Sequence, residues 1–231
     1  MQHLLARAAE FRGKAFESRS ALYRRLATDG QSPKALMISC ADSRVVPELI
    51  MQAEPGDLFV TRNAGNIVPP FSQANGGVSS AVEYAVVALG VRDIVVCGHS
   101  DCGAMKAFSN PAALEKMPNV AAWLRHAHAA HCVVCEAYPD LPAGESTRAI
   151  ALENVVVQIN HLRTHPSVAA AIARGDLSLH GWFFDIETGS ILALDGDTGR
   201  FIEVADHSRT PVAVPAARRL AAGNFIGIAA E

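Results

Sequence analysis

The stretch RDIVVCGHSDCGAMKA, residues 92–107, decides the expected fold. It opens as a run of apolar and β-branched residues without polar alternation, which is typical of a parallel strand covered on both faces. The run stops at Gly98 and turns through the next three residues into a helix expected over 103–109. His99 and Cys102, on this turn, are soft side chains of the kind that bind metals, so the stretch calls for ligand partners elsewhere in the chain.

The segments around this stretch alternate between strand-like and helix-like patterns. Strands are expected at 34–40, 58–62 and 92–98, with a strand–turn–strand–turn pattern over 178–204. Helices are expected at 1–13, 16–28, 76–90, 103–109, 117–136 and 146–163. This order predicts an α/β fold with a mainly parallel central β-sheet, an antiparallel edge strand and flanking helices. With 231 residues, the chain has room for one full-sized domain.

Composition excludes several classes of partner. Lys and Arg number 20 and Asp and Glu 23, for a net charge of −3, so we expect no binding to nucleic acid. The N-terminal residues alternate apolar and charged side chains, unlike a signal peptide, and no apolar run reaches membrane-spanning length. We therefore expect a cytoplasmic protein with no membrane partner. The five cysteines, an odd number, are interpreted as thiols or metal ligands rather than disulfides.

Cys40 provides the missing ligand partner. It closes the apolar run LMISC, while His99 and Cys102 follow IVVCG. In open parallel sheets ligands gather beyond the carboxyl ends of neighbouring strands, so these three side chains are expected to converge. Two Cys and one His suit zinc and leave a fourth position for water or substrate, as a catalytic site requires.

The residues after Cys40 extend this site. In CADSR, Asp42 and Arg44 follow the same strand end, where a guanidinium can hold a carboxylate in a two-pronged hydrogen bond. An Asp this close to zinc acts either as a fourth ligand or as a hydrogen-bond acceptor next to the ligands. Arg44 is expected to decide between the two.

A competing cluster lies in HAHAAHCVVC, residues 126–135. Its C-x-x-C spacing at Cys132 and Cys135 leaves a second metal site or a redox pair open. Helical periodicity already accounts for the spacing, so we interpret the segment as a solvated His face with a packed Cys pair. Cys97, inside the expected strand, is assigned to the core.

Six motifs together resemble those of β-class carbonic anhydrases, most closely the bacterial cyanate-associated and cyanobacterial carboxysomal enzymes. They are CADSRVVPE, GDLFVTRNAGNIVPP, GGVSSAVEYAVVALGV, VVCGHSDCGAMKA, ENVVVQINHLRTHP and LSLHGWFFDIETG. The resemblance extends over about residues 3–205. It implies a lyase that reversibly hydrates CO₂ to bicarbonate and a proton by means of a zinc-bound hydroxide.

The resemblance also implies a role for each matching residue. The zinc ligands are Cys40, His99 and Cys102, and the dyad that gates the fourth zinc position is Asp42 and Arg44. The residues that bind or surround the substrate are Gln31, acting from a neighbouring subunit, Phe59, Tyr84 and the backbone N–H of Gly103.

Since Gln31 acts across a subunit boundary, the resemblance implies an obligate homodimer whose N-terminal helices wrap the partner, with tetramers or larger assemblies left open. The expected organisation is a helical arm over 1–30, a zinc-binding α/β domain over 31–205 and a C-terminal tail over 206–231.

One departure from the family pattern carries its own prediction. Some β-class members shut down at neutral pH by binding bicarbonate in a second pocket built from a Trp, an Arg and a Tyr. The matching positions here are Met37, Arg62 and Phe184. We therefore expect no such bicarbonate switch, and Asp42 paired with Arg44.

Three alternatives remain open at the level of sequence. The same scaffold supports hydrolases of carbon disulfide or carbonyl sulfide, which need the same zinc site. A non-catalytic zinc protein, with Asp42 permanently on the metal, could serve as a docking module. A redox protein would use Cys132 and Cys135.

Overall fold

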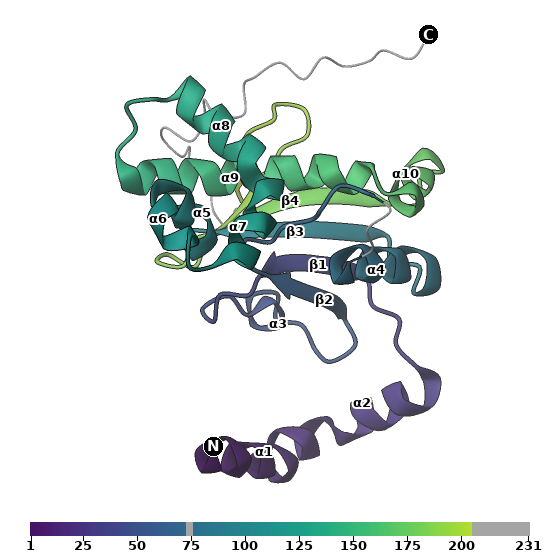
Figure 1. The fold of residues 1–231 in the computed structure, drawn as a ribbon. Coiled ribbons are helices and arrows are strands. Elements are labelled where there is room, and N and C mark those ends of the chain that lie inside the picture. The colour runs from purple at the N-terminus through teal and green to yellow at the C-terminus, as the bar shows by residue number, and fades with distance from the viewer. Residues whose placement is uncertain (73–75, 205–231) are drawn as a thin grey trace.

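A six-stranded sheet forms the centre of the computed structural model, which describes residues 1–72 and 76–204 (Figure 1). Its strands, in spatial order, are β2 (Leu58–Asn63), β1 (Ala35–Cys40), β3 (Asp93–His99), β4 (Ser178–Phe184), β5 (Ile191–Leu194) and β6 (Phe201–Glu203). The first four are parallel, and β5 and β6 add an antiparallel edge of two strands. The α/β fold class is confirmed. The expected C-terminal tail, 206–231, lies outside the described residues.

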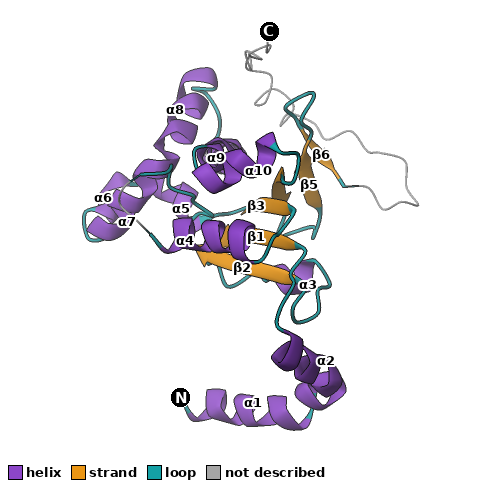
Figure 2. Ribbon diagram, turned by 90° about the vertical axis from the view of Figure 1, so that its right-hand side faces the viewer, coloured by secondary structure: helices purple, strands orange, loops and turns teal. Residues whose placement is uncertain are grey.

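Helices connect these strands and cover the sheet (Figure 2). They are α1 (Gln2–Gly13), α2 (Ala15–Asp29), α3 (Pro47–Ile50), α4 (Gly77–Glu83), α5 (Gly103–Lys106), α6 (Pro111–Leu114), α7 (Pro118–Leu124), α8 (His128–Ala137), α9 (Ala143–Arg163) and α10 (Pro166–Ala173). In the described ranges, no helix is both long and apolar enough to cross a membrane.

The helices differ from the sequence prediction both in their boundaries and in their number. The helix expected over 76–90 ends in a π-helical turn, Tyr84–Ala88, and the helix expected over 117–136 is broken by a 3₁₀ turn, Arg125–Ala127. The short helices α3, α6 and α10 were missed, although each begins with a proline at its first position. Proline is common there because the first helical N–H has no helical partner to lose.

Helix α9 packs very closely on β3 and β4. A Cβ atom added at Gly98 would lie 2.8 Å from a Val155 methyl, and one added at Gly181 would lie 2.9 Å from the other Val155 methyl. These glycines therefore let the backbone of α9 approach the sheet. The contact buries the main core, which includes Ile94, Val96 and Phe183.

The opposite face of the sheet carries a smaller cluster. Met37, Val95 and Cys97 are buried there, and partly buried strand residues surround them: Leu58, Val60, Trp182 and Phe184. Within the described part of the chain, only strand residues build this cluster. The sequence led us to expect that β3 is covered on both faces. In the single chain, this second face is covered less well than the face that packs against α9.

The first two helices form an arm that stands away from the sheet (Figure 1). Neither α1 nor α2 contains a buried residue, and Leu5 is 65% exposed. The arm contacts the sheet domain through the ion pair of Arg19 with Glu54, 2.6 Å.

Candidate metal centre

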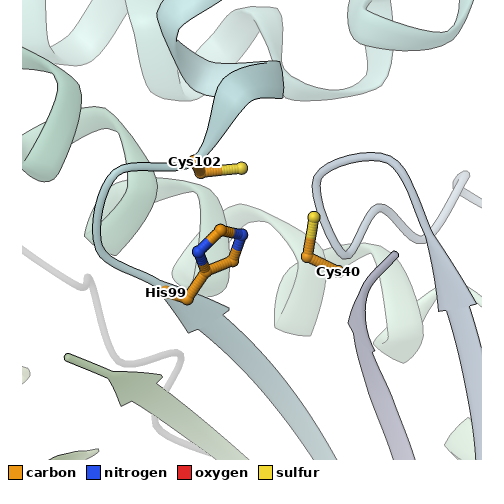
Figure 3. Close-up of side chains that lie close together, drawn as sticks. All are labelled: Cys40, His99 and Cys102. Atoms are coloured by element: carbon orange, nitrogen blue, oxygen red, sulfur yellow. The ribbon is translucent and has the colours of Figure 1, made fainter. Parts of the chain in front are cut away.

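Two adjacent strand ends bring the expected ligands together (Figure 3). Strands β1 and β3 are parallel neighbours, with Ser39 paired to Cys97, so Cys40 and His99 leave the sheet at the same edge. Cys102 reaches the same point from the turn that follows β3. One ligand atom of each residue lies within 4.8 Å of the other two, and all three residues are buried. The expected convergence of Cys40, His99 and Cys102 is confirmed.

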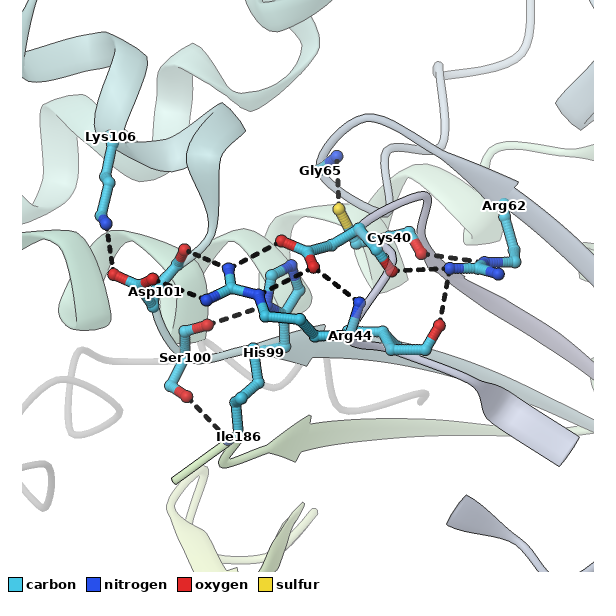
Figure 4. Close-up of polar contacts among 11 residues, drawn as sticks. Cys40, Arg44, Arg62, Gly65, His99, Ser100, Asp101, Lys106 and Ile186 are labelled. Carbon is cyan, nitrogen blue, oxygen red and sulfur yellow. Dashed lines mark hydrogen bonds and ion pairs between the residues drawn. The ribbon is translucent and has the colours of Figure 1, made fainter. Parts of the chain in front are cut away.

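The turn from His99 to Cys102 is held in place by its neighbours. Asp101 has φ +60°, a left-handed conformation that Asp adopts more readily than most residues and that lets the chain reverse within three residues. The Ser100 N–H donates to the carbonyl of Phe184, and the Ser100 hydroxyl accepts from the N–H of Ile186. The turn is thereby tied to the end of β4, as Figure 4 shows for Ser100 and Ile186.

The ring of His99 is oriented for a metal. Its Nδ1 lies 2.8 Å from the carbonyl oxygen of Ser100, to which it donates. Its Nε2 is buried and has no hydrogen-bond partner among the described residues. A buried polar atom without a partner costs free energy, so the ring nitrogen that faces the two sulfurs fits a metal ligand.

The two sulfur atoms shift each other's pKa in opposite directions. The hydrogen bond from Cys102 lowers the pKa of Cys40 to about 4, against the opposing effect of burial. The N–H of Gly65 also donates to the Cys40 sulfur, at 3.4 Å. The same sulfur–sulfur contact, together with burial, raises the pKa of Cys102. A divalent cation between the two sulfurs would allow both to be thiolates. This set of donors therefore suits a divalent cation.

Arg44 holds the carboxylate of Asp42 with two prongs. Its Nε donates to Asp42 Oδ1 at 3.0 Å and its Nη2 to Asp42 Oδ2 at 2.8 Å. These hydrogen bonds lower the pKa of Asp42 well below its usual range. The expected pairing of Asp42 with Arg44 is therefore present in the structure.

A second carboxylate, which sequence reasoning missed, holds Arg44 from the other side (Figure 4). Asp101 accepts from Arg44 Nη1 at 2.9 Å and also pairs with Lys106. Its position on the same turn as His99 and Cys102 is the signal that could have identified it. Arg44 is thus fixed between the loop after β1 and the turn after β3.

Arg62 ties down the loop that carries Asp42. Its guanidinium donates to the carbonyl oxygens of Cys40, Asp42 and Val45 at 3.1, 2.7 and 2.6 Å. Met37 and Phe184, the other two positions matched to the family's bicarbonate pocket, lie in the cluster of strand residues around Met37, Val95 and Cys97.

The expected substrate residues do not all lie near the ligands of their own chain. Gly103 does, because it follows Cys102 and begins α5. Phe59 pairs with Leu36 near the start of β1, about 13 Å along the strand from Cys40 at roughly 3.3 Å per residue. Its ring lies 5.8 Å from that of Tyr84, and Gln31 precedes the start of β1.

The remaining cysteines divide into two groups. Cys97 is fully buried, and burial raises its pKa to about 12, so its assignment to the core is confirmed. Cys132 and Cys135 are both exposed on α8. The interpretation of these two as a packed pair was wrong, because their side of the helix faces solvent.

Comparison with known proteins gives a consistent result. The family model described as carbonic anhydrase matches residues 35–191. A carbonic anhydrase of Pseudomonas aeruginosa is 54% identical over 197 residues, which are 85% of this chain and 89% of that protein.

Two solved structures extend the comparison. The β-carbonic anhydrase CcaA is similar with a TM-score of 0.85 and 46% identity, over 88% of this chain and 98% of that one. One of two β-carbonic anhydrases of Sordaria macrospora, described as tetrameric, is similar with a TM-score of 0.74 and 32% identity, over 84% and 95% of the two chains.

Proposed function

The chain belongs to the β-class carbonic anhydrase family, whose reaction is the hydration of CO₂, and we propose that it performs this reaction with zinc held by Cys40, His99 and Cys102. The observation that carries the proposal is the convergence of three buried donors beyond two adjacent strand ends. When bound there, zinc would act as a Lewis acid that lowers the pKa of a water molecule and so makes hydroxide available, more of it as pH rises. Three protein ligands leave a position open for that water.

In this proposal Asp42 aims the nucleophile. Each carboxylate oxygen has two lone pairs, so Asp42 can bind Arg44 and still accept a hydrogen bond from the attacking hydroxyl group. That hydrogen bond turns the oxygen's own lone pair toward CO₂. Arg44 acts as the gate because it keeps both Asp42 oxygens away from the fourth ligand position. Because Arg44 already binds the carboxylate of Asp42, the structure favours an enzyme over a docking module in which Asp42 permanently binds the metal.

The pocket for CO₂ is proposed to form between two chains. Gln31, Phe59 and Tyr84 gather near the start of β1, whereas the ligands lie at its end. They are therefore placed to line the pocket of a partner rather than of their own chain. Tyr84 is half exposed in the single chain, as this requires. The N–H of Gly103 at the start of α5 lacks a helical partner and is the proposed donor to substrate oxygen from the chain that holds the metal.

The arm supports the same proposal of an obligate homodimer. A helical pair that buries none of its residues is marginal in water, so α1 and α2 need a surface to pack on. We propose that residues 1–30 wrap the partner and that residues 31–205 form the zinc-binding domain. The tetrameric description of the Sordaria macrospora relatives makes larger assemblies a further expectation. A cytoplasmic location stays a prediction from the sequence.

Stopped-flow CO₂ hydration across pH 7–9 tests the function. The same sample is dialysed against a mild chelator and its zinc content is determined. We expect fast hydration with about one retained zinc per chain, and activity that persists at pH 7 in added bicarbonate. Cys102→Ser should lose both zinc and turnover, whereas Cys132→Ser, at an exposed site, should lose neither.

Two results would count against the proposal. One retained zinc per chain without turnover at any pH would favour the docking module. Turnover of CS₂ in place of CO₂ would favour the sulfur-substrate hydrolase.

A further inference from the structure

A second group of metal-ligating side chains lies on α8, which contributes no residue to the buried ligand set. His128, His131, Cys132 and Cys135 follow one another at spacings of three, one and three residues. Positions three and four apart share a helix face, so all four side chains project from the same stripe. The stripe is accessible: His128, Cys132 and Cys135 are exposed and His131 is half-buried.

The four side chains form two His–Cys pairs, each one helical turn long. His128 Nδ1 lies 3.4 Å from Cys132 Sγ, and His131 Nε2 lies 3.3 Å from Cys135 Sγ. Ligand atoms of His128, His131 and Cys132 lie within 4.8 Å of one another. Tetrahedral zinc with bonds of about 2.0–2.3 Å separates its donors by roughly 3.3–3.8 Å, so these three donors are near the required spacing. Cys135, which contacts His131, must rotate to join them.

The environment of His131 differs from that of an ordinary solvated histidine. Its ring stacks on Phe108, with the ring centroids 4.9 Å apart and the planes 13° from parallel. Its Nδ1 is buried and finds no hydrogen-bond partner in the described part of the chain. Stacking on Phe108 and the contact of Nε2 with the Cys135 sulfur therefore fix this ring beside Cys135.

We propose that His128, His131, Cys132 and Cys135 bind a second metal ion, a thiophilic d¹⁰ cation of the Zn²⁺ or Cd²⁺ type. Two thiolates and two imidazoles favour such ions over Mg²⁺ or Ca²⁺, which prefer oxygen ligands. All four donors come from one exposed helix, so the ion exchanges with solution more readily than one held by Cys40, His99 and Cys102. The proposal does not depend on CO₂ hydration.

Metal counting on the full-length protein tests the site. The protein is reduced with a phosphine, loaded with zinc, equilibrated with Cd²⁺ without chelator, and analysed for total zinc and cadmium. We expect two metal ions per chain in the unaltered protein and one in Cys132→Ser/Cys135→Ser. The ultraviolet band of cadmium–thiolate bonds should weaken in parallel. His126→Ala, which removes the nearest histidine outside the stripe, is the matched control and should retain two ions.

Each other outcome overturns the proposal. A single metal ion in the unaltered protein would show that the stripe binds none, and two ions in the double cysteine variant would place the second ion elsewhere. Retained CO₂ hydration in the variants reports an intact fold and buried site. If the double variant does not fold, His128→Ala provides the same test, because it removes one exposed ring and should also reduce the count to one.

Discussion

At the scale of single residues, the proposed gate rests on Arg44. Replacing it with alanine removes both side-chain hydrogen bonds that hold Asp42, so in this proposal the carboxylate is free to turn onto the metal. Arg44→Ala should retain zinc yet lose turnover by about 10²-fold or more, the usual loss when a hydrogen-bonding catalytic group is misplaced. Stopped-flow assays with zinc analysis check both quantities.

Matched variants separate the effect of the two parallel hydrogen bonds of Arg44 from the effect of its positive charge. Arg44→Lys keeps the positive charge but cannot form two parallel hydrogen bonds, so its turnover should lie between those of the unaltered protein and Arg44→Ala. Arg174→Ala removes an arginine from an exposed pair with Asp176 and should leave turnover unchanged. Near-full turnover in Arg44→Ala would refute the gate.

At the scale of elements, the contact of α9 with the sheet depends on two glycines. In Gly181→Ala the new methyl would lie 2.8 Å from Ile159 and 2.9 Å from Val155, so the helix must move outward. Overpacking of this kind costs about 1–3 kcal/mol of the free energy of unfolding, measured by urea denaturation. Gly144→Ala, in the first turn of α9 with open space around it, should be neutral or stabilising by up to about 1 kcal/mol. Equal effects of the two changes would contradict close packing.

The turn between β4 and β5 makes a pH-dependent contribution to stability. Burial tends to raise the pKa of Asp185, but hydrogen bonds from Arg148 and from the N–H groups of Thr188 and Glu187 lower it overall. A carboxyl whose pKa is lower in the folded state stabilises the protein above its unfolded pKa, about 3.9, and loses this effect as pH falls through the folded value.

Asp185→Asn should therefore cost about 1–3 kcal/mol at pH 7, and the gap from the unaltered protein should close as pH falls below about 4. Urea unfolding from pH 7 to 3.5 measures the gap. Asp195→Asn is the comparison, because Asp195 makes the same kind of turn with Thr198 but no ion pair in the described chain. Hydrogen bonds from Thr198 lower the pKa of Asp195 as well, so its gap should close in the same direction but be smaller. A gap that stays constant with pH would exclude the ionised carboxylate as its source.

At the scale of the whole molecule, short sequence patterns predicted the features that depend on neighbouring residues. An apolar run located β1 and a β-branched run located β3, and the residues at or just after their ends are Cys40, His99 and Cys102, which converge because parallel strand ends share an edge. What depends on distant contacts was not predictable. Asp101 reaches Arg44 only through the fold, and the π-helical turn after α4 leaves no mark in the residue pattern.

The proposed sharing of each pocket between two chains is the remaining prediction at this scale. Cys40→Ser should abolish zinc binding in one chain, and Gln31→Ala should impair substrate binding in the other, so each homodimer should be nearly inactive. In a mixed dimer, the zinc of the Gln31→Ala chain meets the intact Gln31 of the Cys40→Ser chain. One of its two pockets is then complete, and CO₂ hydration should return to about half that of the unaltered dimer, as expected for a pocket built by two chains.

Co-expression with two affinity tags isolates the mixed dimer, and light scattering confirms its mass. A mixed dimer of Cys40→Ser with Cys102→Ser is the control, because both changes remove the metal and no complete pocket can form. Pockets confined to single chains would give no recovery in either mixture, since the zinc and Gln31 would then never come from intact copies of the same chain. Recovery in the first mixture alone therefore requires that Gln31, near the start of β1, completes the metal centre at the end of the partner's β1.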